Sequence, residues 1–317
     1  MKNKKYISLL IIFSLLLFFY SCESLGDIAA AGAKVAQAAG VISEETANKI
    51  ANEKTIESLN KTGVAWKNAN EEIDSHQEYY IGRAVAANIL VSYKLQTNRQ
   101  AMVTYLNKIC NSLVVNSPKP EIFNGYHVNI LDTDEINAFA TPGGHILVTR
   151  GLLASATSED ELASVIAHEV AHIQLQHALA AIKNSRLTQA LKQTASTAGG
   201  VAGDITGNMT ISELTTVFDE SIGEIITTMV TNGYSRDQEY DADSTALALL
   251  ELAGYEPSSL ISMLRVLEKN QAGKTGGFGK THPTPAQRIA NAEKKAGNFR
   301  VDPDTRSFRV SRYKAAI

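Results

Sequence analysis

The stretch from His168 to His172 reads His-Glu-Val-Ala-His and holds the residue types from which a metal-dependent hydrolytic site is built. Along an α-helix four residues turn the side-chain direction by roughly 400°, so His168 and His172 would emerge on one face about one turn apart. Two imidazole nitrogens at that spacing can reach one tetrahedral cation. Glu169 would project close enough to take a proton from a water molecule beside that cation. The pattern predicts a zinc site with Glu169 as its base.

The surrounding sequence predicts the helix that this geometry requires. Ser158-Glu159-Asp160-Glu161 is typical of a capping box at a helix start. Apolar residues follow it at helical spacing, namely Leu162, Val165, Ile166, Val170 and Ile173. The motif therefore lies inside an amphipathic helix.

Two histidines leave a catalytic zinc site incomplete, because such sites generally use three protein ligands and keep one position open. The best further candidates lie in the stretch 234–243. There Ser235 can cap a helix on which Glu239 and Asp243, four residues apart, share a face. We expect Glu239 to be the third ligand and Asp243 to accept the free ring N–H of a ligating histidine, which fixes its tautomer. A solvated acidic helix face is the alternative.

The other histidines fit the metal less well. A metzincin would have a histidine six residues after His172, but that residue is Ala178, which excludes this class. His177 would lie roughly 140° further round a continuing helix, too far for the same metal. His145 alternates with Leu147 and is expected to be a hydrogen-bonded strand residue, with a ligand role as the alternative.

Two short extended runs joined by Thr141-Pro142-Gly143-Gly144 predict a β-hairpin, whose second strand runs from His145 to Thr149. A hairpin edge beside a metal can take a peptide as an added strand. The residues predicted to bind substrate in this way are Asn137, Ala138, Phe139 and Ala140. A purely structural hairpin is the alternative.

Further elements are predicted from apolar periodicity. Helices are expected over 71–93, 100–114, 258–269 and 285–296, and a strand over 126–131. An Ala-, Gly- and Thr-rich segment over 188–208 precedes an amphipathic helix over 211–230. We interpret this segment as a lid or a membrane-facing flap over the cleft, with a structural helical hairpin as the alternative. The predicted fold class is α+β and mostly helical, with a zincin-type helix packed on a small sheet that has an edge hairpin.

Several of these motifs together resemble metallopeptidase family forty-eight. HEVAH with His177 beyond it, SRDQEYDAD, NAFATPGGHI and THPTPAQR occur in the family's order over roughly residues 70–296. That gluzincin family includes BepA-like and LoiP-like periplasmic proteases, HtpX and the CaaX prenyl proteases. The resemblance implies one zinc ion held by His168, His172 and Glu239, with Glu169 as catalytic base and Asp243 behind the ligands.

The resemblance also bears on His282, which spacing alone would make a turn residue. In BepA-like members the matching histidine can approach the zinc and block it, so a gated resting state is implied. Oxyanion stabilisation could come from His282 or from Tyr234, and the sequence does not choose between them.

The amino terminus is typical of an exported bacterial lipoprotein. Three lysines among the first five residues precede an uncharged run from Tyr6 to Tyr20, and Ser21-Cys22 resembles a lipobox. We predict a signal peptide over 1–21, a tether anchored by lipid at Cys22 and including a possible helix over 22–60, a metallopeptidase domain over 61–300 and a tail over 301–317. Plain cleavage or an uncleaved anchor are the alternatives to lipidation.

Composition limits the partners. The 317 residues carry a formal net charge of -3 and no long basic run, which argues against nucleic acid. Cys110 is the one cysteine besides Cys22, so no disulfide framework is expected. We predict a periplasmic endopeptidase on a membrane, the outer membrane being favoured, acting on exported or misfolded envelope polypeptides with a possible separate adaptor. A gated zinc-binding chaperone that rarely cuts is the alternative.

Overall fold

The structure is a computed structural model that describes residues 72–180, 182–184, 222–223, 225–271, 277, 281–282, 285–297 and 302–317, and near the amino terminus residues 30, 33–34, 37, 43–45 and 48. The segment 1–21, Cys22, most of the tether, the segment 188–208 and most of the helix expected over 211–230 lie outside the described residues. Among those described, no helix is both long and apolar enough to cross a membrane. The compact unit considered below comprises residues 73–182 and 219–317.

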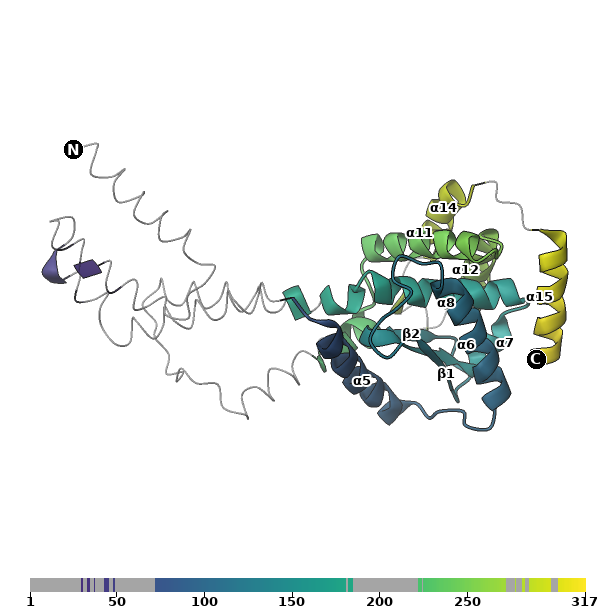
Figure 1. Ribbon diagram of the computed structural model, residues 1–317, viewed down its shortest axis with the longest axis horizontal. Coiled ribbons are helices and arrows are strands. Elements are labelled where there is room, and N and C mark those ends of the chain that lie inside the picture. The colour runs from purple at the N-terminus through teal and green to yellow at the C-terminus, as the bar shows by residue number, and fades with distance from the viewer. Residues whose placement is uncertain are drawn as a thin grey trace. The chain divides into compact units, whose positions relative to one another are not determined.

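A sheet of three strands in the order β1-β3-β2 lies in this unit (Figure 1). β1 (His127–Leu131) runs parallel to β3 (His145–Thr149), and β2 (Ala138–Thr141) pairs with β3 in the antiparallel sense. The turn η1 (Pro142–Gly144) joins β2 to β3, and its Gly143 has a φ of 70°, which glycine adopts without steric cost. The predicted hairpin is confirmed, and β2 has a strand neighbour on only one side within the described residues.

Helices cover the sheet and account for most of the described chain. They are α5 (Ser75–Ser92), α6 (Gln100–Val114), α7 (Arg150–Ser155), α8 (Glu159–Gln174), the π-helix η2 (Thr227–Asn232), α11 (Arg236–Leu252), α12 (Ser258–Gln271), α14 (Pro285–Lys295) and α15 (Pro303–Ala316). The expected fold class, α+β and mostly helical, is confirmed.

Alternate strand residues face opposite sides of the sheet and enter two hydrophobic cores. One core joins Ile130 and Val148 to α6, α8, α11 and α12. The other joins Phe139 and Leu147 to α5 and to the apolar residues around η2. Because both faces of the sheet are covered, the hairpin is held firmly between α5 and α8.

The contact between α5 and the hairpin turn depends on a glycine. A Cβ atom added at Gly82 would lie 1.6 Å from the carbonyl oxygen of Pro142. No larger side chain can therefore stand at Gly82 unless the helix and the turn move apart.

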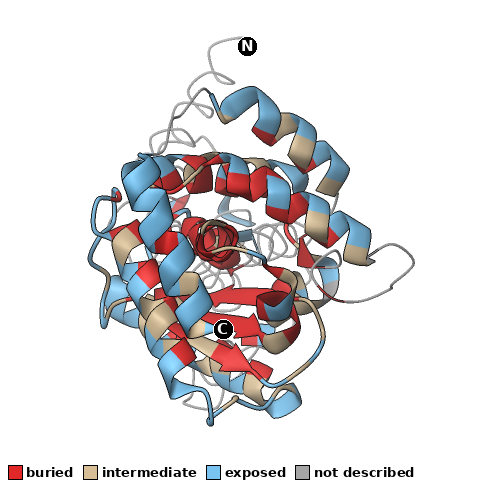
Figure 2. Ribbon diagram, turned by 90° about the vertical axis from the view of Figure 1, so that its right-hand side faces the viewer, coloured by how far each residue is buried: buried red, intermediate tan, exposed pale blue. Residues whose placement is uncertain are grey.

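The helix α8 carries the His-Glu-Val-Ala-His motif through the centre of the unit. Figure 2 views α8 along its axis, where it is buried on every side. The Ser158 hydroxyl accepts a hydrogen bond from the Glu161 N–H at 3.2 Å and caps the helix. The Glu161 carboxylate accepts hydrogen bonds from the Thr157 N–H and hydroxyl at 2.6 and 2.9 Å, and not from the Ser158 N–H. The prediction of a full capping box was therefore wrong, although the serine cap is present.

Residues that the sequence analysis assigned to a polar tail form the helix α15, which packs on α8 and α6. Arg309 is 2% exposed and pairs with Asp160 at 3.0 Å, and Arg312 pairs with the buried Glu159. Acidic residues in the first turn of α8 interact favourably with its dipole but are costly to bury alone. The arginines of α15 therefore stabilise the amino-terminal end of α8.

Candidate metal centre

The two histidines of α8 point at the same place. The Nε2 atoms of His168 and His172 lie 3.0 Å apart, and both side chains are almost fully buried. This is the geometry expected for residues one turn apart on one helix face. Two imidazole donors are thus presented to one point inside the protein.

The helix α11 brings an acidic residue to that point. Ser235 caps it in a capping box with Gln238, and α11 packs closely along α8. One Glu239 oxygen lies 3.5 Å from His172 Nε2 and the other lies 3.6 Å from His168 Nε2. Glu239 was the expected third ligand, and the structure brings its carboxylate together with the two imidazoles.

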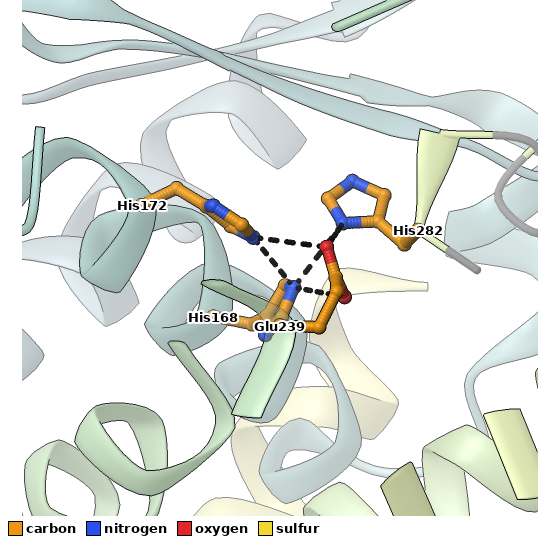
Figure 3. A group of neighbouring side chains, drawn as sticks. All are labelled: His168, His172, Glu239 and His282. Carbon is orange, nitrogen blue, oxygen red and sulfur yellow. Dashed lines mark hydrogen bonds and ion pairs between the residues drawn. The ribbon is translucent and has the colours of Figure 1, made fainter. Parts of the chain in front are cut away.

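A third imidazole completes the group. His282 Nδ1 lies 2.9 Å from Glu239 Oε1 and 3.3 Å from His168 Nε2. One ligand atom from each of the four residues lies within 4.8 Å of the others, and the four side chains point toward one another (Figure 3). Spacing alone would have made His282 a turn residue, whereas the structure places it beside the candidate ligands.

The charges at this site suit a divalent cation. Glu169, Glu239 and Asp243 are each 0% exposed, and the buried guanidinium beside them belongs to Arg288. Three buried carboxyl groups lie beside one guanidinium, and a buried carboxylate is costly unless a cation balances its charge. Imidazole and carboxylate donors are those that zinc prefers.

Asp243 lies behind one of the two α8 histidines. Its Oδ1 is 3.1 Å from His168 Nδ1, the nitrogen directed away from the ligand group. Burial acts to raise the pKa of Asp243, but the Arg288 guanidinium and the hydrogen bonds outweigh it and hold the pKa at about 2. An ionised Asp243 can therefore accept the His168 N–H and fix the ring.

Arg288 is the site residue that sequence reasoning missed. It lies on α14 and is 0% exposed; it contacts Asp243 through Nε at 2.9 Å and through a terminal nitrogen at 2.7 Å, and pairs with Glu239 at 2.7 Å. Burial pushes the pKa of Glu239 up, but Arg288 and His282 bring it well below its usual value. Arg288 is the last residue of Thr281-His282-Pro283-Thr284-Pro285-Ala286-Gln287-Arg288, one of the motifs behind the resemblance. Helical spacing gave no sign that this arginine would be buried.

Neither side-chain oxygen of the buried Glu169 accepts a hydrogen bond from any described residue. The Nε2 atom of His282 lies 3.6 Å from its carboxylate. Burial raises the pKa of Glu169 above its usual value, although His282 and His168 oppose that change. Glu169 is thus a proton acceptor without a fixed partner beside the ligand group.

Tyr234 lies against the imidazole ring of His172. Its ring stacks on the imidazole with centroids 4.1 Å apart and planes 21° apart. The π-helix η2 ends at Asn232, and Gly233, with a φ of 76°, turns the chain into Tyr234. The hydroxyl is buried without a hydrogen-bond partner among the described residues, and burial raises the pKa of Tyr234 well above its usual value. It is therefore a neutral donor near Glu169.

Thr281, the residue before His282, forms hydrogen bonds with residues from two different segments around the site. The carbonyl of Thr281 accepts from the Tyr234 N–H at 3.1 Å, and the Thr281 hydroxyl donates to the Asn137 side-chain oxygen at 3.1 Å. Burial alone would lower the pKa of His282, but the carboxylates of Glu239 and Glu169 attract the proton more strongly and raise it. His282 is held where it faces carboxylates on two sides.

His177 contacts a ligand candidate although it is not part of the four-residue group. The sequence analysis assumed a continuing helix, but α8 ends at Gln174 and Gln176 has a φ of 55°. The chain turns back there, and His177 Nδ1 lies 2.9 Å from His172 Nδ1. Burial lowers the pKa of His177 to about 4. Excluding His177 from the metal ligands on the basis of a helical angle was therefore wrong reasoning.

Comparison with known proteins agrees with this arrangement. The 24% identity to the beta-barrel assembly-enhancing protease of Escherichia coli K12 extends over 225 residues, 70% of this chain and 43% of that protein. Metalloprotease LoiP of the same organism is 29% identical over 167 residues, 52% of this chain and 61% of that protein. The mitochondrial metalloendopeptidase OMA1 of Schizosaccharomyces pombe is 24% identical over 203 residues, 63% of this chain and 55% of that protein. The chain spans about half the length of these relatives.

Two histidines of one helix and a glutamate of a second converge at one point, which is the ligand arrangement found in one class of zinc metallopeptidases. Residues 100–296 match peptidase family M48, and the chain belongs to that family. The resemblance predicted from the motifs is thereby confirmed.

Proposed function

We propose that this chain is a zinc endopeptidase of the bacterial cell envelope. The observation that carries the proposal is the group of four ligand atoms within 4.8 Å of one another. Beside this group lies the Glu169 carboxylate, which accepts no hydrogen bond from the described residues. In the proposal His168, His172 and Glu239 hold the zinc, Glu169 is the catalytic base, and Asp243 orients His168.

The mechanism uses the residues in the positions that the structure gives them. Zinc, when bound, supplies a Lewis acid that lowers the pKa of water and polarises the scissile carbonyl. Glu169 takes the proton from the attacking water and returns it to the leaving amine. The Tyr234 hydroxyl, which has no competing partner among the described residues, donates to the developing oxyanion.

The edge of β2 that pairs with no described strand is the proposed place for the peptide. The Thr149 N–H donates to the Asn137 carbonyl at 3.0 Å, so alternate residues of β2 bond to β3. The main-chain groups of Ala138 and Ala140 therefore face the other edge, where an extended substrate can pair with them. The Asn137 side chain accepts from the Ala138 N–H at 2.9 Å and would direct pairing toward Ala140.

His282 is proposed to gate the site. Its imidazole lies where it contacts both Glu239 and the neighbourhood of Glu169, and Thr281 beside it bonds to Asn137 of the proposed substrate edge. A peptide on this edge would compete with that bond. A gate and an oxyanion donor give opposite results on removal: His282→Ala should raise cleavage several-fold if His282 blocks the site, and should lower it if His282 stabilises the oxyanion.

The cellular place and the substrates are further parts of the proposal. Relatives named as a beta-barrel assembly-enhancing protease and as metalloprotease LoiP support an enzyme acting on exported or misfolded envelope proteins. The lipobox-like Cys22 supports a lipid-anchored form in the periplasm, and the outer membrane is the favoured membrane in this proposal. Metabolic labelling with palmitate tests the anchor, because Cys22→Ser should lose the label.

Glu169→Gln tests the chemistry. The full chain in mild detergent should bind one equivalent of zinc as wild type and the variant alike, while casein cleavage should fall about 10²–10⁴-fold in the variant. Glu251→Gln, an exposed change on α11, is the matched control and should cleave normally. Cleavage at the wild-type rate by Glu169→Gln would refute the mechanism. Zinc binding without cleavage in wild type and in His282→Ala would favour the gated chaperone.

A further inference from the structure

The two histidines of α8 have different partners on their outward nitrogens. His168 Nδ1 faces the Asp243 carboxylate at 3.1 Å. His172 Nδ1 faces the Nδ1 atom of His177 at 2.9 Å, a second imidazole. The site is thus supported by a carboxylate on one side and by a ring nitrogen on the other.

The direction of the hydrogen bond between the two rings follows from the role of His172. Its Nε2 points into the ligand group, 3.0 Å from His168 Nε2 and 3.5 Å from Glu239 Oε1. If the Nε2 lone pair is used for a metal, the ring hydrogen must be on Nδ1, which then donates. His177 Nδ1 must accept, so the hydrogen of the His177 ring is on its Nε2.

The backbone conformation and the hydrogen bonds on either side of His177 fix its position. After α8 ends, Gln176 adopts the left-handed conformation with a φ of 55°, and its side chain donates to Glu78 at 3.0 Å. The His177 carbonyl accepts a bond from Gln238 at the start of α11 at 3.3 Å. His177 as a whole residue is 7% exposed. An Asn or Gly would adopt this backbone conformation more readily than Gln, so the turn is kept at some steric cost.

We propose that His177 is a positioning residue for His172. It accepts the His172 N–H, fixes the tautomer that leaves Nε2 available to zinc, and holds the ring between itself and Tyr234, whose ring stacks on His172. This inference rests on the proposed function. It adds a residue outside the ligand group to the determinants of zinc retention.

Zinc affinity of the full chain, measured by competition with a chromophoric chelator, tests the inference without using proteolysis. His177→Leu removes the acceptor and should weaken zinc binding about 10–100-fold. His177→Asn should recover most of the affinity, because the side-chain oxygen of Asn can occupy the position of the histidine Nδ1. His145→Leu is the control, since His145 is a half-buried histidine of β3 outside the ligand group, and it should bind zinc normally.

Stability and cleavage separate this role from a structural one. Unfolding of the metal-free His177→Asn variant should match wild type, and at saturating zinc its cleavage should recover. Unchanged zinc affinity in His177→Leu would overturn the inference while leaving the peptidase proposal standing. Equal losses in His177→Leu and His177→Asn would also overturn it, because the acceptor would then be irrelevant. If wild type binds zinc but does not cleave, only the proposed function fails.

Discussion

Replacement of Arg288 by methionine should destabilise the protein far more than any exposed charge change. Arg288 is 0% exposed and makes contacts of 2.7 Å with both Glu239 and Asp243. At an effective dielectric constant of about 20, opposite charges about 4 Å apart attract by about 4 kcal/mol, so two carboxylates give about 8 kcal/mol before the desolvation of the guanidinium is subtracted. Breaking a buried pair by removing one partner typically costs about 3–5 kcal/mol. We therefore expect Arg288→Met to lower the free energy of unfolding by that amount.

The assay is urea or thermal unfolding of the metal-free full chain, followed by circular dichroism. A loss of about 3–5 kcal/mol corresponds to a fall in Tm of roughly 10 °C for a unit of this size. The matched control is Arg265→Met. Arg265 pairs with Glu293 at 2.6 Å between α12 and α14, but the two side chains are 60% and 47% exposed. Such an exposed pair contributes at most about 1 kcal/mol.

Two outcomes would refute the reasoning about Arg288. If Arg288→Met and Arg265→Met lose the same stability, the buried guanidinium does not compensate the carboxylates. If Arg288→Lys unfolds like wild type, the contact with two carboxylates at once is irrelevant, because a lysine ammonium is a point charge that cannot match the planar fork of arginine. Added zinc should narrow the gap between wild type and Arg288→Met, since a divalent cation supplies part of the missing positive charge.

Three other changes test separate parts of the structure. Gly82→Ala should cost about 1–3 kcal/mol of unfolding free energy because its Cβ meets the Pro142 carbonyl at 1.6 Å. Gly223→Ala, whose Cβ meets no atom of the described residues within 4 Å, should not destabilise. Equal effects of the two changes would contradict the close contact of α5 with the hairpin. Tyr234→Phe should lower kcat about 10²-fold with zinc affinity and stability kept, and unchanged turnover would remove the hydroxyl from the mechanism. The pKa of Asp243 lies at about 2, below its usual 3.8, so ionised Asp243 stabilises the protein above about pH 4 and that contribution is lost as the pH falls to 2. The stability gap between wild type and Asp243→Asn should therefore shrink by about 2 kcal/mol from pH 5 to pH 2, and a constant gap would show that the carboxylate is not ionised.

Much of the fold follows from local patterns in the sequence. Apolar spacing placed a helix over 100–114, where α6 has the same limits, and the serine caps located the starts of α8 and α11. The Pro-Gly-Gly turn located the hairpin. These signals worked because each element buries one face and begins or ends at a residue with a specific backbone preference.

The candidate ligands were predictable for a related reason. His168 with His172, and Glu239 with Asp243, lie four residues apart on helices, so their mutual geometry is fixed before the helices meet. Only the meeting of α8 with α11 was a matter of tertiary structure. The residues that were missed depend on such contacts alone: Arg288 reaches the site through the packing of α14.

His177 and α15 show two further limits of local patterns. His177 reaches His172 because α8 stops early and Gln176 turns back, and helical angles do not apply past that point. The helix α15 looked polar because its buried face is made by an arginine, Arg309, whose partner Asp160 is 149 residues away in the sequence. Apolar periodicity does not detect a face that is buried through ion pairs.

The pKa values of the two buried glutamates at the site are shifted in opposite directions. Their different contacts with Arg288 contribute to this difference. Arg288 lies against Glu239 at 2.7 Å, and with His282 it brings the pKa of Glu239 well below its usual value. Glu169 is equally buried but has no such contact, and burial raises its pKa. A ligand must stay ionised, whereas a residue that takes and returns a proton must be able to hold one near neutral pH. Because Arg288 of α14 contacts Glu239, the pKa of that carboxyl falls, whereas burial raises the pKa of Glu169; the two directions agree with the proposed roles of ligand and base.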